Sequence, residues 1–352
     1  MLRIVAFVLL FCFVSLYFIM LCIACPQSQH GRTRHLWPYW RDQLAKADVD
    51  ATWIPTRHPG HAVELARGAT EPVVAVGGDG TINEVLTGLL SANSNQPMGV
   101  LYAGTSPDFC RFHHLPTDPQ AAMHTLLAGK VKPVDTIRIR HADRSGSKKT
   151  AYFACSSNVG FGAAVARFSN RYRKFLGDFP GTLLGVLRAF VTTRPIDVTL
   201  ELDGQEYRFR RCNHLILVKN PRIASGLQLD LPLVPDDGQA YALVVHDLGR
   251  FGLCCQLPKF YSGRIAESEA IFLQPFQRAR VRTTQPMLAR SRATGSESKM
   301  ENPSQATGLT RLKNTQIEVE YDGDPHGFLP LEAEILPKSL KLIGAETDDA
   351  RK

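Results

Sequence analysis

A glycine-rich turn at residues 77–81 carries the groups best suited to chemistry. The strand-like run 73–76 ends in Gly-Gly-Asp-Gly, and Thr81 and Glu84 have the spacing of a capping box that opens a helix. Glycine lets other groups approach the backbone closely, and free N–H groups at a helix start bind phosphate. The Asp79 carboxylate stands where it could hold Mg²⁺ on those phosphates. We therefore predict a polyphosphate-binding turn in preference to a plain tight turn capped by Asp79.

Two further acidic sequences are candidates for binding a metal or moving a proton. They are Asp236-Asp237-Gly238 and Asp322-Gly323-Asp324. Because Asp-Gly pairs are also typical turn residues, the residues alone predict a plain turn at either place as readily as a functional site.

The segments that would position these residues indicate an α/β protein. Up to about residue 130, helices and strands alternate, which is typical of a parallel sheet covered by helices. The predicted helices there are 37–47, 61–67, 82–90 and 117–129, and the predicted strands are 73–76 and 99–103. Beyond residue 131, turn pairs separate strand-like runs, which indicates an antiparallel sheet with one helical insertion near 167–190. These runs are 135–140, 198–202, 214–218 and 240–245.

The N-terminus is apolar and allows two interpretations. Residues 4–24 carry no charged side chain and are long enough to span a bilayer. Alternatively, residues 18–24 form the first buried strand, and the hydrophobic extension 1–17 is too short to span and acts as a peripheral anchor. We favour the second interpretation. With either, we expect the protein at the cytoplasmic side of a membrane, peripheral or anchored by this segment, because arginines follow the apolar run.

The composition is that of a globular protein with acidic partners. Of 352 residues, 44% are hydrophobic and 21% charged, and the net charge is +8. This surplus favours nucleotide phosphates, anionic lipid headgroups or nucleic acid. The basic and aromatic stretch 167–175 is read as a packed helix or as a membrane-facing surface. Nucleic-acid binding is disfavoured because no recognised module accompanies the charge.

Residues 77–85 resemble the signature of the diacylglycerol kinase, sphingosine kinase and ceramide kinase superfamily, including its bacterial lipid kinase branch. NAD kinases and phosphofructokinases share the Gly-Gly-Asp-Gly core, whereas the Asn-Glu-Val continuation is typical of the lipid kinases. Other matches to this diacylglycerol-kinase-like lipid kinase family follow in the expected order between about residues 18 and 344. They are the segments 25–31, 56–66, 104–109, 158–162, 236–238 and 321–324.

The resemblance implies an α/β fold of two lobes. An N-terminal parallel-sheet lobe would bind nucleotide, and a C-terminal antiparallel β-rich lobe would bind the lipid substrate. The expected boundaries are a nucleotide-binding lobe at 18–130, a lipid-substrate lobe at 131–330, a closing segment at 331–344 and a tail at 345–352. A mobile insertion is expected at 290–308, which is rich in Ser, Thr, Gly and Asn.

The resemblance also implies an ATP- and Mg²⁺-dependent kinase that phosphorylates a lipid hydroxyl, on diacylglycerol or a related lipid. Asp324 would accept the hydroxyl proton, Asp322 would support it, and Asp79 would position the catalytic Mg²⁺. The residues expected to contact ATP are Ser28, Thr56, Gly77, Gly78, Asp79, Gly80, Thr81, Asn83, Glu84 and Thr105. A second, structural Mg²⁺ is implied, with these ligands: the Asp237 carboxylate and the backbone carbonyls of Val234 and Gln239.

Four residues depart from the family pattern and bear on activity. Cys25 and Pro107 each stand for Asn, Gln29 stands for a loop glycine, and Asp324 stands for Glu. Gln adopts a positive φ less readily than Gly, proline lacks the N–H group, and Asp reaches about 1.5 Å less far than Glu. Two rival functions therefore stand beside the lipid kinase: a nucleotide- or lipid-binding protein that has lost turnover, and a NAD kinase-like enzyme.

Overall fold

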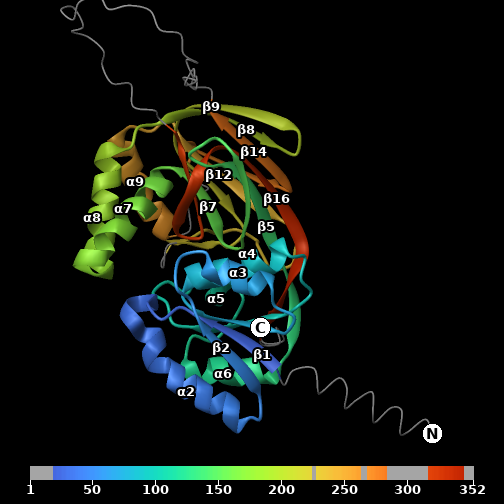
Figure 1. The fold of residues 1–352 in the computed structure, drawn as a ribbon. Coiled ribbons are helices and arrows are strands. Elements are labelled where there is room, and N and C mark those ends of the chain that lie inside the picture. The colour runs from blue at the N-terminus through green and yellow to red at the C-terminus, as the bar shows by residue number, and fades with distance from the viewer. Residues whose placement is uncertain (1–18, 224–226, 263–267, 284–315, 345–352) are drawn as a thin grey trace, which may run out of the picture.

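A computed structural model describes residues 19–223, 227–262, 268–283 and 316–344. The hydrophobic extension 1–17, the predicted insertion 290–308 and the tail 345–352 lie outside these described residues. Figure 1 shows the N-terminal helices and strands in one half of the molecule and long strands with the helices α7, α8 and α9 in the other.

Strands with both faces covered form the centre of the N-terminal half. They are β1 (Ile19–Ala24), β2 (Asp50–Pro55), β3 (Val73–Gly77) and β4 (Met98–Tyr102). Their order is β2-β1-β3-β4, and each neighbouring pair is parallel. Val73 and Ala75 of β3 belong to the core on one face of the sheet, and Val74 and Val76 to the core on the other. Burial on both faces explains the continuous apolar run of β3.

Helices pack on both faces of these strands. They are η2 (Ser28–Gly31, a 3-10 turn), α2 (Arg32–Lys46), α3 (His61–Arg67), α4 (Asp79–Ser91), α5 (Asp108–Phe112) and α6 (Pro119–Ala128). The apolar stripe of α4, from Ile82 to Leu90, shares the core of Val73, whereas Trp40 of α2 and Met123 of α6 share the core of Val74. The turn between β3 and α4 is thereby held from both sides.

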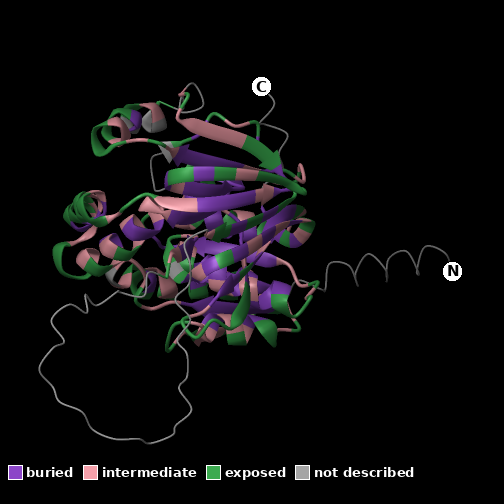
Figure 2. Ribbon diagram, turned by 90° about the horizontal axis from the view of Figure 1, so that it is seen from above, coloured by how far each residue is buried: buried purple, intermediate pink, exposed green. Residues whose placement is uncertain are grey.

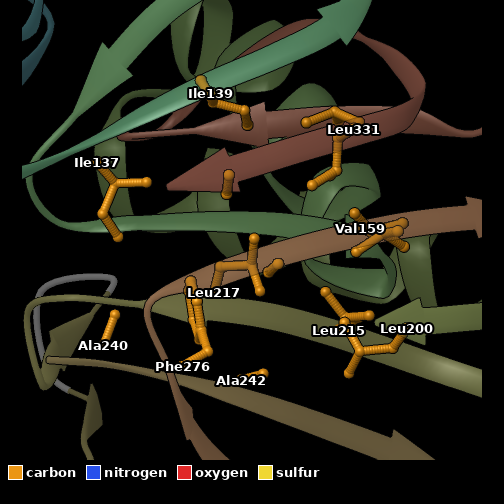
Figure 3. Packing of buried hydrophobic residues seen from close by; sticks show 14 of the residues in the cluster. Ile137, Ile139, Val159, Leu200, Leu215, Leu217, Ala240, Ala242, Phe276 and Leu331 are labelled. Atoms are coloured by element: carbon orange, nitrogen blue, oxygen red, sulfur yellow. The ribbon is translucent and has the colours of Figure 1, made fainter. Parts of the chain in front are cut away.

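The C-terminal half is built from antiparallel strands. They are β5 (Val131–Ala142), β6 (Lys148–Phe153), β7 (Ser156–Gly160), β8 (Ile196–Leu202), β9 (Gln205–Val218), β10 (Arg222–Ile223), β11 (Leu227–Gln228), β12 (Ala240–His246), β13 (Ile271–Phe276), β14 (Arg278–Thr283), β15 (Glu318–Tyr321) and β16 (Asp324–Ile343). Its helices are α7 (Phe161–Leu176), α8 (Asp178–Thr192) and α9 (Arg250–Tyr261). Figure 3 shows Ile137, Val159, Leu217 and Leu331 meeting in its largest core. Figure 2 shows buried residues concentrated in the strands and exposed ones on the outer helices.

Strand β16 joins the two halves. It pairs with β5 in antiparallel fashion over most of its length, and Leu342 near its end pairs in parallel with Met98 of β4. Ile335 of β16 lies in the core of the C-terminal half, whereas Leu340 and Leu342 lie in the core of α4 and β3. The sheet is therefore continuous from β13 to β2.

The predicted α/β fold with an antiparallel, β-rich C-terminal half is confirmed, with two local corrections. The single helix expected near 167–190 is two helices, because Gly177 adopts φ +78° between α7 and α8. Helix α4 begins at Asp79 rather than after Thr81, with Gly78 at the N-cap. The capping box expected from Thr81 and Glu84 is therefore wrong.

The expected location at the cytoplasmic side of a membrane, held by the apolar N-terminus, is also corrected. Residues 19–24 of the apolar run form β1, which is buried beyond Ile19 and pairs with β2 and β3. In the part of the chain that the structure describes, no helix is both long and apolar enough to pass through a bilayer.

Candidate active site

The β3–α4 turn is shaped by glycines that admit no side chain. A Cβ on Gly77 would lie 2.4 Å from the Thr81 Oγ1, so the first turn of α4 folds directly against the strand end. A Cβ on Gly78 would lie 3.1 Å from the Gly104 Cα and 3.2 Å from the Ser28 Oγ. The backbone at Gly78 thus meets the loops that follow β1 and β4. The Ser28 hydroxyl donates to the Ala103 carbonyl at 2.8 Å and fixes this junction.

Asp79 is the first residue of α4, and only one of its two carboxylate oxygens has a hydrogen-bond donor. Its Oδ2 accepts a hydrogen bond from the Tyr102 hydroxyl at 2.9 Å, whereas its Oδ1 is buried without a hydrogen-bond partner. Burial raises the pKa of Asp79 to about 7, and the charges of Asp108 and Asp322 add to this effect. A buried carboxylate oxygen without a donor, among other carboxylates, fits a divalent cation such as Mg²⁺.

Asp322 lies in the tight turn between β15 and β16 with φ +47°. Its Oδ1 accepts from the backbone N–H groups of Cys155 and Ser156 at 3.0 and 3.2 Å, and its Oδ2 accepts from Ala154 N at 3.2 Å. The Asn83 amide of α4 donates to the same Oδ2 at 2.9 Å and to the Tyr152 carbonyl at 2.9 Å. Burial raises the pKa of Asp322 above its usual value. Asn83 therefore orients Asp322 and connects the two halves of the molecule.

Asp324 is the exposed carboxylate of the site. Its Oδ1 accepts from the Asn170 amide of α7 at 2.7 Å, and its Oδ2 lies 3.7 Å from the position of a Cβ on Gly80. Partial desolvation raises the pKa of Asp324, while the charges of Arg173 and Lys174 lower it. The sequence allowed Asp322-Gly323-Asp324 to be either a hairpin turn or a functional site. In the structure these residues form the hairpin turn, and this turn places the Asp324 carboxylate near Gly80. Such a carboxylate can accept a proton from a hydroxyl next to the glycine turn.

Three predicted nucleotide contacts have other partners in this structure. Glu84 accepts from the N–H groups of Gly60 and Ala62 and so holds the start of α3. The Thr56 N–H donates to the Ala24 carbonyl at 2.8 Å, directly after β2. The exposed Thr105 hydroxyl donates to the Asp178 carboxylate of α8 at 3.2 Å.

Gln29 takes the conformation expected of the glycine that it replaces. Its φ is +43°, in the left-handed region, and its side-chain oxygen accepts from the Arg32 guanidinium at 3.0 Å. The loop after β1 therefore keeps a glycine-like path, at a conformational cost of about 1 kcal/mol.

The predicted ligands of the structural Mg²⁺ surround a cation of the protein itself. Asp237 and the carbonyls of Val234 and Gln239 all accept hydrogen bonds from the Lys219 ammonium. An ammonium and a divalent metal cannot share one position, so the residues present do not fit a metal there.

Three residues of these sites, Tyr102, Asn170 and Lys219, were not predicted from the sequence. Tyr102 is the last residue of β4, which pairs in parallel with β3. A polar residue at this position could have been predicted to lie near the β3–α4 turn. Nothing local distinguishes Asn170, because its partner Asp324 lies 154 residues further along the chain. The signal at Lys219 was a charged residue directly after an apolar strand.

The chain matches two family models. They are the diacylglycerol kinase catalytic domain, over residues 20–139, and the YegS C-terminal NAD kinase beta sandwich-like domain, over residues 155–307. The two matches lie in the N-terminal and C-terminal halves of the chain, and together they support its resemblance to the diacylglycerol-kinase-like lipid kinase family. The kinase family predicted from residues 77–85 is thereby confirmed.

Members of the lipid kinase family from several bacteria resemble the chain. The "Probable lipid kinase YegS-like" of Klebsiella pneumoniae is 30% identical over 193 residues, which are 53% of this chain and 60% of that protein. A diacylglycerol kinase of Staphylococcus carnosus is 29% identical over 191 residues, which are 52% of this chain and 58% of that protein. The chain thus matches about three fifths of the length of these curated relatives. A diacylglycerol kinase crystal structure from Bacillus anthracis shares the fold, with a TM-score of 0.64, 16% identity and coverage of 94% of this chain and 98% of that one.

Proposed function

We propose that this chain is an ATP- and Mg²⁺-dependent lipid kinase that transfers the γ-phosphate to a hydroxyl of diacylglycerol or a related lipid. The observation that carries the proposal is that Asp324 of the β15–β16 hairpin lies beside Gly80 of the β3–α4 turn. A proton acceptor and a phosphate-binding turn thus face each other across the two halves.

In the proposed reaction, the N-terminal half binds ATP. The N–H groups at the start of α4 donate to its phosphates, and Gly80 keeps the space next to the Asp324 Oδ2 free of a side chain. Asp79, through its unpaired Oδ1, is the residue that would hold Mg²⁺. When bound, the metal neutralises charge on the transferred phosphoryl group.

The C-terminal half provides the proton acceptor. Asn170 holds the Oδ1 of Asp324, which leaves Oδ2 toward Gly80 to accept the hydroxyl proton. The raised pKa of Asp324 makes it a stronger base than an ordinary aspartate. Asp322 lies next to the site, where backbone donors and Asn83 fix the orientation of its carboxylate.

A lipid acceptor is supported by the surface of α7 and α8. Phe175 and Phe179 are 82% and 80% exposed, and Leu183, Leu187 and Val191 of α8 are also exposed. The same two helices hydrogen-bond to site residues: Asn170 of α7 donates to Asp324, and Asp178 of α8 accepts from Thr105. An acceptor with apolar chains and a hydroxyl group matches this combination of an apolar surface and a base.

The experiment is transfer of radiolabelled γ-phosphate from Mg-ATP to a panel of acceptors in mixed micelles. The panel holds diacylglycerol, monoacylglycerol, a sphingoid base, ceramide and a polyprenol, with NAD as the rival acceptor. We expect transfer to a lipid. Transfer to NAD alone would support a NAD kinase-like enzyme, and ATP binding without any transfer would support a binding protein.

Two variants separate metal binding from proton transfer in this assay. Asp79→Asn should weaken Mg-ATP binding and lower turnover at least about a hundredfold, with a nearly unchanged thermal melt. Asp324→Asn should keep Mg-ATP affinity but lower turnover by about a hundredfold, the loss expected for a general base. Full activity in either variant contradicts the role given to that residue.

A further inference from the structure

The ammonium of Lys219 lies where the family resemblance implies a structural Mg²⁺. Lys219 directly follows β9 and is completely buried, which lysine tolerates only with partners. Its Nζ donates to the carboxylates of Asp237 at 2.6 Å and Asp135 at 2.9 Å. The carbonyls of Val234 and Gln239 lie 3.0 and 3.1 Å from the same Nζ, so its three N–H groups are shared among four acceptors. Apart from Asp237, the acceptors lie 2.9–3.1 Å from Nζ, as in N–H···O hydrogen bonds, whereas Mg²⁺ and Ca²⁺ bind oxygen at about 2.0–2.6 Å.

The carboxylate oxygens around Lys219 already have donors. Asp237 Oδ1 also accepts from Gln239 N at 2.9 Å, and its Oδ2 accepts from Val234 N at 2.9 Å. Asp135, which is itself completely buried, accepts from Gly238 N at 2.7 Å and Lys338 N at 2.8 Å. The arrangement therefore satisfies the buried ammonium and both carboxylates without a further cation.

We propose that Lys219 is a built-in cation that takes the place of a divalent metal and closes this site to metals. The inference does not depend on the proposed lipid kinase activity, because this cluster is separate from the β3–α4 turn. Mg²⁺ is then needed only together with nucleotide, and the fold itself does not require a divalent metal.

The cluster secures the part of the fold that supports Asp322. Its members come from β5, from the end of β9, from the 234–239 loop and from β16. The backbone N–H of Lys219 donates to the Cys155 carbonyl at 2.9 Å, and the N–H of Cys155 donates to Asp322 Oδ1 at 3.0 Å. A cation fixed by a covalent side chain keeps these strands in place whatever the free Mg²⁺ concentration.

The first test is the thermal melt of the unmodified protein without nucleotide, in EDTA and in millimolar Mg²⁺ or Ca²⁺. We expect the same midpoint in all three conditions. A rise in midpoint with either metal that disappears in Asp237→Asn would overturn the proposal, because a metal would then bind these ligands despite Lys219. This test needs no variant that removes the buried lysine.

The second test opens the site with Lys219→Ala. In EDTA, this variant leaves the buried Asp135 and the partly buried Asp237 without a cation, and its melting midpoint should fall by roughly 5–10 °C. Millimolar Mg²⁺ or Ca²⁺ should restore most of that loss, and about one equivalent of metal should remain after gel filtration. A midpoint that does not fall in EDTA, or that no divalent cation restores, would count against the proposal.

Two control variants show whether the rescue comes from this site. Lys219→Met removes the charge but fills the space, so it should be destabilised without recovery in metal. Lys219→Ala combined with Asp237→Asn removes a ligand and should also lose the recovery. If Lys219→Ala does not fold even when prepared with Ca²⁺, the proposal is judged by the first test alone. That test compares the melting midpoints of the unmodified protein in EDTA and in metal.

Discussion

At the scale of single residues, Glu320 is a buried carboxylate held beside the site. Only 2% of its surface is exposed. It accepts hydrogen bonds from the Asn158 amide and from the N–H of Gly323, in the turn that carries Asp322 and Asp324. Burial raises the pKa of Glu320 to about 8, and the two aspartates add to this. The residue is therefore neutral in the folded protein over most of the physiological range.

This pKa predicts a pH-dependent loss of stability. Between pH 4.5, the usual pKa, and about 8, Glu320 is ionised in the unfolded chain and neutral in the fold. The folded state then binds the extra proton. The contribution of Glu320 to the free energy of unfolding is therefore complete below pH 4.5, and it falls by about 1.4 kcal/mol per pH unit as the pH rises toward 8. Urea unfolding between pH about 6 and 7.5 should show the advantage of wild type over Glu320→Gln shrinking with this slope. Histidines titrate in both proteins and cancel, so parallel profiles would contradict the assignment.

The residues of the site could be predicted from the sequence only where one segment holds the whole pattern. Gly77 to Thr81 lie in one short segment, so their types and order were sufficient to predict a strand-to-helix turn, but not the residue at which the helix begins. The bond between Asn83 and Asp322 joins positions 239 residues apart, and no local pattern indicates it. The conversion of the Asp237 site to an ammonium site also depends on Lys219 and Asp135, from two other strands.

At the scale of elements, the position of the β3–α4 turn depends on a glycine at the strand end. The sequence predicted a strand, a turn and a helix there, and these are present. The predicted helix start was wrong because the Thr81 and Glu84 pattern favours an N-cap three residues after Gly78, the observed N-cap. In the fold, Thr81 is buried against Gly77 and Glu84 holds α3, so packing outweighs the local capping preference.

Replacing this glycine tests how the turn is built. Gly77→Ala places a Cβ 2.4 Å from the Thr81 Oγ1 and 2.9 Å from its Cβ, and α4 must move away from β3. We expect about 1–3 kcal/mol lower stability and at least about tenfold weaker Mg-ATP binding by calorimetry. Gly68→Ala is the matched control, because the nearest atom to its Cβ would be the Leu65 carbonyl oxygen at 3.8 Å, an ordinary contact, and φ is −90°. Equal behaviour of the two variants would mean that close packing at Gly77 does not shape the site.

At the scale of the whole molecule, β16 makes the two halves depend on each other. Leu331 and Ile335 lie in the core of the C-terminal half, and Leu340 and Leu342 lie in that of the N-terminal half. Asp324 starts the same strand. Residues 331–344 are expected from the sequence to be a closing segment after two lobes, because a single strand shared by two cores has no local signature. Loss of either core therefore removes support from the strand that carries the proton acceptor.

This shared strand predicts a single unfolding transition. All three tryptophans, Trp37, Trp40 and Trp53, lie in α2 and β2, so their fluorescence reports on the N-terminal half, whereas far-UV circular dichroism reports on the whole chain. The two urea curves should coincide. Leu342 is fully buried, so Leu342→Ala should lower the free energy of unfolding by about 2–4 kcal/mol and shift both midpoints together. A shift of the fluorescence curve alone would mean that the halves unfold independently, and β16 would then transmit no stability between the two sides of the site.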